Sequence, residues 1–312
     1  MGFDGAATFS GKHNGVQSLL KKISPHSVFV HCHCHLLQLA CVQAANHTSG
    51  IKHVYTTLTT LWKFFHYSPK RAECLKEVQR VLNMAELKII KPSDTRWLAH
   101  KRCAKVVKEN YSAILLALSN IYEETNEPEA LEISKALSKR STVSALFLLD
   151  YALPQVAKLS KTLQAEKLDL TIISSLVDAT LHTFDDALLP AANWVLELLD
   201  IKESLEEVAD IKITMPDIES FQKTVGNPFI STLKDNISSC FTSQDVVSAF
   251  SIFDPKKVPS LESPKFKDYG EDSLKVLIDH YGVDRLADTL DGEECPKSAL
   301  ISVDVCSEWK TF

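Results

Sequence analysis

The stretch Val143–Leu153, with the sequence VSALFLLDYAL, is the most apolar part of this 312-residue chain. Asp150 interrupts it, and it is shorter than the roughly 18 apolar residues that a membrane-spanning helix needs. We therefore expect it to form part of a helix over residues 143–163, and we expect no membrane partner. The composition agrees, because 9 glycines and 12 prolines are few for this length, whereas the frequent Leu, Ala, Lys and Glu favour helices.

Most of the remaining chain also has helical character. Ser68 and Pro69 mark the clearest start, since serine caps a helix and proline fits its first turn. The exception is Ser27–Cys32, SVFVHC, whose β-branched and aromatic residues predict a buried strand. Further helices are expected over residues 17–23, 36–45, 54–65, 70–84, 95–118, 128–137, 169–183, 189–205, 227–240 and 273–281.

The expected fold class is therefore mainly α, with an α/β segment at the N-terminus. We divide the chain into a partial α/β segment over residues 1–50 and a helical domain over 51–250. Residues 251–312 are expected to form a linker rich in Pro, Lys and Ser, a short helix and an acidic tail.

The formal net charge of −6 is the balance of two parts of opposite sign. Residues 1–105 carry 15 lysines and arginines against 5 acidic residues, and residues 106–312 carry 19 against 35. Since salt confines the influence of each charge to about 8 Å, the N-terminal third is suited to a polyanion despite the acidic whole. We expect DNA as a partner of residues 1–105 and proteins as partners of the helical region. The alternative is that the lysines only line solvated helix faces.

Five potential metal ligands, HCHCH, occupy residues 31–35. On a strand, His31, His33 and His35 would point to one side and the two cysteines to the other, so one tetrahedral ion could not use neighbouring residues. Only Cys32 and His35 have a usable spacing, and no CxxC or HxxxH elsewhere supplies the other ligands. We therefore expect no metal site but a partly buried Cys/His edge at a strand-to-helix turn, with structural zinc as the alternative.

A second candidate site is the sequence SDTRW, residues 93–97. Trp97 in the first turn of a helix can stack on a base while Arg96 contacts a phosphate, and helix N-termini favour anions. The alternative is that Trp97 packs into the core.

Three motifs follow one another in the first hundred residues: DGAATFSGKHNGVQSLL from Asp4, HCHCHLLQLA from His31 and DTRWLAH from Asp94. In this order they resemble the hAT transposase superfamily, and especially the zinc-finger proteins derived from such transposases. The resemblance covers about residues 1–105. It implies a truncated RNase H-like α/β fragment followed by a large all-helical insertion domain.

The resemblance also implies roles for individual residues. Asp4 would be the second of three metal-binding acids, and Cys32 and His35 would be the C-x-x-H pair used in DNA handling. Arg96 and Trp97 would lie where the family stacks a tryptophan on a flipped base. We add two further candidate nucleic-acid contacts in the basic turn after Asp4, which are Lys12 and His13.

The resemblance places the other two acids of the triad before Met1 and after Phe312. Two-metal phosphoryl transfer needs several carboxylates, so we expect no enzymatic activity and no cofactor, with Mg²⁺ relevant only to a complete triad.

The expected function is that of a catalytically inactive transposase-derived fragment that binds nucleic acid or protein. One alternative is a helical protein-interaction scaffold without DNA affinity, and another is an incomplete sequence of an active or domesticated hAT transposase. The eight cysteines show no repeated spacing and the first residues show no signal segment. We therefore expect a nuclear or cytoplasmic protein that is not secreted.

Overall fold

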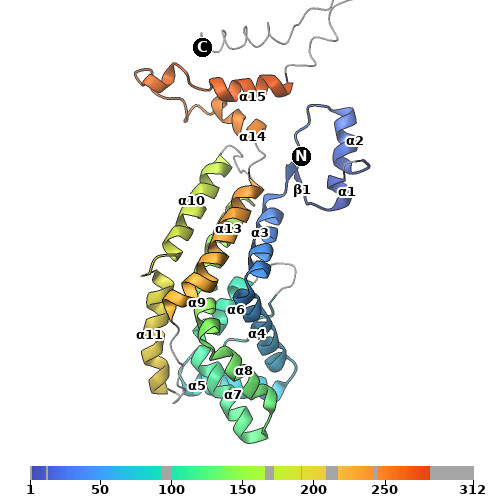
Figure 1. Cartoon of the computed structure of the whole chain (residues 1–312). Helices are drawn as coiled ribbons and strands as arrows, with labels where there is room; N and C mark the ends of the chain where they lie inside the picture. The colour runs from blue at the N-terminus through green and yellow to red at the C-terminus, as the bar shows by residue number, and fades with distance from the viewer. Residues whose placement is uncertain are drawn as a thin grey trace, which may run out of the picture. The chain divides into compact units, whose positions relative to one another are not determined.

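The computed structural model describes residues 2–11, 13–92, 100–165, 172–190, 192–208, 217–241 and 245–281. As expected, the protein is mainly helical (Figure 1). Its contacts group the chain into two compact units. Unit 1 comprises Met1–Leu36, Leu163–Val177 and Cys240–Phe312, and unit 2 comprises Leu37–Thr162 and Asp178–Ser239.

The described part of unit 2 consists of helices and their connections. Helices α3 and α10 begin in unit 1, and α13 ends there at Cys240. In chain order the helices are α3 (His33–His47), α4 (Ser49–His66), α5 (Pro69–Val81), α6 (His100–Glu109), α7 (Tyr111–Thr125), α8 (Pro128–Leu137), α9 (Arg140–Thr162), α10 (Ile173–Ala187), α11 (Asn193–Val208), α12 (Ile218–Phe221), the π-helical segment η3 (Gln222–Gly226) and α13 (Asn227–Cys240).

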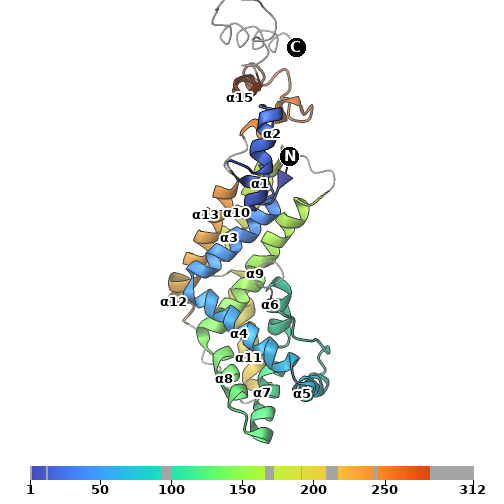
Figure 2. The ribbon, with the colours of Figure 1, turned by 90° about the vertical axis from the view of Figure 1, so that its right-hand side faces the viewer.

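Helix α9 is the central element of unit 2, and Figure 2 lets the reader follow it among its neighbours. It packs against helices α4, α6, α8, α11 and α12. Every residue from Thr142 to Leu149 is buried, which is typical of a helix surrounded by others on all sides. The most apolar stretch of the sequence is therefore the core of the unit, as part of a helix close to the expected bounds. No helix in the described ranges is long and apolar enough to cross a bilayer.

The cap at Ser68 is confirmed. Ser68 Oγ accepts a hydrogen bond from the Arg71 backbone N–H at 3.3 Å, and Pro69 is the first residue of α5. Helices α8 and α13 have the predicted bounds residue for residue.

The single helix expected over residues 95–118 is wrong for the part that the structure describes. Helix α6 ends at Glu109 and α7 begins at Tyr111, with Asn110 between them. The Asn110 side chain is buried and donates from Nδ2 to the Val106 carbonyl at 3.0 Å. It also accepts from Gln79 of α5 at 2.9 Å, so a tertiary contact fixes the junction.

Unit 1 contains the strands. Its elements are β1 (Gly2–Phe3), α1 (Ala7–Ser10), α2 (Val16–Ile23), β2 (Val30–His31), α14 (Asp245–Ala249), the 3₁₀ turns η4 (Phe250–Phe253) and η5 (Pro264–Phe266), and α15 (Glu271–Tyr281). Strands β1 and β2 are parallel, with Gly2 opposite Val30 and Phe3 opposite His31. The strand expected over residues 27–32 is thus shorter than predicted, because its partner β1 has only two residues.

The C-terminal part of unit 1 has a small core of its own, made by Ala249, Ile252, Leu274 and Leu277. His26 and His280 join this part to the N-terminal part through reciprocal hydrogen bonds. Each ring bonds to the backbone carbonyl of the other residue, at 2.8 Å and 3.0 Å.

Candidate nucleic-acid interface

The parallel strands bring Asp4 and the HCHCH run to one edge of the sheet. Asp4 follows β1 directly and His31 ends β2, and the carboxyl ends of parallel strands meet at the same edge, where ligands of open α/β sheets bind. Asp4 is exposed, and its Oδ1 accepts the Ala6 N–H at 3.2 Å. This local turn leads into α1.

Gly5 lies against the His31 ring. A Cβ atom on Gly5 would lie 2.6 Å from His31 Nε2, so a larger residue would displace the imidazole. The His31 ring also stacks on His35, with ring centroids 5.9 Å apart. Nδ1 of His31 is buried and has no hydrogen-bond partner among the described residues.

The run over residues 31–35 lies at a strand-to-helix turn, as expected, so the alternation considered for a continuous strand does not apply to it. Strand pairing ends at His31, and α3 begins at His33, so the last three residues of the run form the first turn of a helix. His33 is buried against Phe241, with ring centroids 5.2 Å apart. Burial, and then the neighbouring His31, lower the pKa of His33.

Cys32 stands immediately before α3, and its carbonyl accepts the Leu36 N–H at 3.0 Å. His35 lies in the first turn of α3, stacked on His31. Within the part of the chain that the structure describes, no group of three or more His, Cys, Asp or Glu side chains is arranged to hold a metal ion.

Of the other predicted nucleic-acid contacts, the structure describes only His13. His13 is exposed in the turn before α2, and its carbonyl accepts from Ser18 Oγ at 3.0 Å. Lys12, Arg96 and Trp97 lie outside the described residues.

A longer signal was missed in the sequence. No aspartate or glutamate occurs between Asp4 and Glu73, a stretch that holds seven lysines and arginines and eight histidines. It includes all of α4, a helix without a carboxylate. The exposed residues of this helix include Lys52, Lys63 and His66, which span about 21 Å along its axis.

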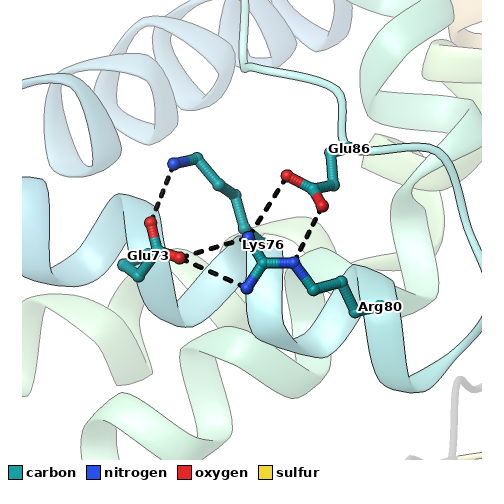
Figure 3. A network of polar contacts seen from close by, with 4 residues as sticks. All are labelled: Glu73, Lys76, Arg80 and Glu86. Carbon is teal, nitrogen blue, oxygen red and sulfur yellow. Dashed lines mark hydrogen bonds and ion pairs between the residues drawn. The ribbon is translucent and has the colours of Figure 1, made fainter.

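Two of the first three carboxylates after this stretch, Glu73 and Glu86, are held by cations, and the third, Glu77, is exposed. Glu73 bonds to Lys76 at 2.8 Å and to Arg80 at 3.3 Å, and Arg80 also bonds to Glu86 at 2.8 Å (Figure 3). The hydrogen bond from Lys76 lowers the pKa of Glu73, with Arg80 acting in the same direction. Both carboxylates are therefore ionised and already paired at neutral pH.

No known family model matches this chain, and no solved structure matches it. The functional interpretation therefore depends on the residues and contacts described above and on the three motifs of the first hundred residues.

Proposed function

We propose that this protein binds nucleic acid through its N-terminal third, as a non-catalytic, transposase-derived protein of the nucleus. The observation that carries the proposal is the absence of carboxylates between Asp4 and Glu73 in a stretch that is rich in lysine and histidine. Such a stretch matches a phosphate backbone, which binds cations and repels carboxylates. The stretch supplies no carboxylate ligands for a two-metal centre, because Mg²⁺ needs several oxygen ligands and the stretch contains no aspartate or glutamate.

Exposed lysines in the N-terminal third differ from those of the acidic part in their ion pairs, which argues against the alternative that they only line solvated helix faces. Lys52 and Lys63 of α4, and Lys88 and Lys91 after α5, are exposed and form no ion pair with other described residues. In the acidic part of the chain, by contrast, Lys108 bonds to Asp150 at 2.8 Å and also pairs with Glu197. The N-terminal lysines are therefore available to an external anion.

The geometry of unit 1 supports the proposed RNase H-like origin of the N-terminal segment. Two parallel strands are connected through helices, and Asp4 follows the first strand at the edge where ligands of open α/β sheets bind. His31 and His35 lie at the same edge, next to Gly5.

The salt dependence of DNA binding tests the proposal. Labelled single-stranded, hairpin and duplex DNA would be titrated with the full chain at 50 and 200 mM salt, with fluorescence anisotropy as the readout. If the four exposed lysines each contact one phosphate, the affinity for a single strand should fall about 50-fold over this range. Replacing all four with glutamine should remove most of this dependence.

A matched control carries the same charge change in the acidic part. It replaces four exposed lysines of unit 2, Lys139, Lys158, Lys161 and Lys223, with glutamine and should leave binding almost unchanged. Absence of binding at 50 mM salt, or equal losses for the two sets, would contradict the proposal.

A second candidate function is a protein-interaction scaffold, which the exposed leucines of α11 favour. Leu196 is 48% exposed and Leu199 is 44% exposed, and their spacing puts them on one face of the helix. If this face carries the function, the double variant Leu196→Glu with Leu199→Glu should abolish self-association of the chain, measured by sedimentation velocity. The wild-type chain should then show no binding in the DNA titrations.

A further inference from the structure

We infer that the C-terminal end of α4 carries a stacking site for an unpaired nucleobase, built from Trp62, His66 and Tyr67. The inference rests on the proposed function and specifies its ligand as single-stranded nucleic acid.

The three rings form a compact cluster in which His66 and Tyr67 are exposed and Trp62 is buried. The His66 imidazole lies on the Trp62 indole, with ring centroids 4.5 Å apart and an angle of 23° between the planes. The Tyr67 ring is edge-on to both, at 5.8 Å from Trp62 and 5.1 Å from His66. Trp62 is only 8% exposed, whereas Tyr67 is 71% exposed. Trp62 therefore anchors the cluster, and Tyr67 presents its ring to solvent.

The backbone of Tyr67 is held from both sides. Its N–H donates to the Lys63 carbonyl at 3.1 Å, closing the last turn of α4. The next residue, Ser68, caps α5, and Pro69 fixes the first backbone angle of that helix. A ring on such a short, rigid junction loses little conformational entropy when it binds a ligand.

Three lysines lie close to this aromatic cluster, one of them by its distance to a ring and two by their positions along the chain. Lys63 lies one helical turn before Tyr67, Lys91 Nζ is 5.2 Å from the centroid of the Trp62 ring, and Lys70 is exposed in the first turn of α5. The nearest acidic residue along the chain, Glu73, is paired with Lys76 and Arg80 (Figure 3).

This combination favours nucleic acid over protein as the ligand. Single-strand binding sites place exposed aromatic rings for the bases beside lysines or arginines for the phosphates. Protein-interface hot spots instead have aromatic residues in desolvated pockets, whereas Tyr67 is open to water.

Tyr67→Ala tests the inference directly. Stacking of one base on an aromatic ring is worth about 1–3 kcal/mol, which corresponds to a loss of about 5- to 150-fold in single-strand affinity. Duplex affinity should change less than twofold, because paired bases do not present their faces. Tyr67→Phe should retain single-strand affinity, and Phe253→Ala, which removes another exposed aromatic ring, should leave it unchanged.

A second measurement identifies the contact itself. Single-stranded DNA that contains 5-iodouracil should crosslink to the peptide with Tyr67 when irradiated. The full chain should keep its circular dichroism spectrum and melting temperature in Tyr67→Ala, since the side chain is mostly exposed.

The outcomes separate the two proposals. If the wild-type chain binds no DNA at 50 mM salt, the proposed function fails and the stacking site fails with it. If it binds DNA but Tyr67→Ala weakens single strands and duplex equally, or weakens neither, only the stacking site is overturned. A change in self-association without a change in DNA affinity would assign the cluster to a protein contact and also overturn it.

Discussion

Gln79 and Asn110 form a buried polar pair whose removal should measurably destabilise unit 2. Gln79 is 0% exposed and Asn110 is 1% exposed. Gln79 Nε2 donates to Asn110 Oδ1 at 2.9 Å and to the Leu87 carbonyl at 3.0 Å. One amide thus joins α5, the segment after it and the junction of α6 and α7.

The substitution Gln79→Met removes the amide while keeping the side-chain length. It leaves the buried Asn110 Oδ1 and the partly buried Leu87 carbonyl without these donors, at a cost of about 1–3 kcal/mol for a fully buried group and less for the other. Part of this cost is offset, because Gln79 Oε1 has no partner among the described residues and its own burial penalty disappears. The expected net loss is about 2 kcal/mol in the free energy of unfolding.

Urea unfolding, followed by circular dichroism, measures this loss. Gln43→Met on the exposed side of α3 makes the same chemical change at the surface and should stay within about 0.5 kcal/mol of wild type. The double variant Gln79→Met with Asn110→Ala should lose about 1 kcal/mol less than the sum of the single variants. Strict additivity, or a loss in Gln79→Met no larger than in the control, would refute the reasoning.

Two further predictions concern a helix cap and a titrating group. Ser68→Ala should cost about 1 kcal/mol by leaving the Arg71 N–H uncapped, and Ser68→Asp should restore most of it in thermal melts; equal melting temperatures for all three proteins would contradict the role of the cap. Because burial lowers the pKa of His33 from 6.5, the unfolded chain takes up this proton first on acidification. The stability that neutral His33 provides should therefore be complete above pH 6.5 and be lost as the pH falls through the lowered pKa. His33→Phe, which can still stack on Phe241, should show a smaller loss between pH 7.5 and 5.5 in urea midpoints, and an unchanged pH dependence would count against this assignment.

Local signals account for the parts of the fold that could be predicted. Pro128 opens α8 at its first position, where a missing N–H costs nothing, and Ser68 opens α5 through its hydroxyl. The break at Asn110 could not be predicted in this way, because it coincides with a hydrogen bond from Gln79, 31 residues away in sequence. The end of β2 at His31 likewise follows from the length of its partner β1.

In the candidate sites, too, local sequence signals could be recognised, whereas contacts between distant residues could not. The motif of Asp4 could be recognised, but the strand β1 that precedes it was not predicted, because it has only two residues. The stacking of His31 on His35 depends on where α3 begins. The cluster around Tyr67 carries a sequence signal, since His66 lies one turn after Trp62 in a stretch without carboxylates. Its exposure depends on the junction of α4 and α5, which only the structure gives.

The reciprocal bonds of His26 and His280 have a consequence for synthesis on the ribosome. They join residues 254 positions apart, so the first segment of unit 1 leaves the ribosome long before its partner is made. At 5–20 residues per second this delay is roughly 10–50 s. A two-stranded sheet is at best marginally stable in water, and β1 with β2 has no other strand among the described residues to support it. During translation, unit 2 can therefore fold ahead of unit 1, and the nascent N-terminal segment lacks the hydrogen bonds of His26 to His280 until α15 emerges.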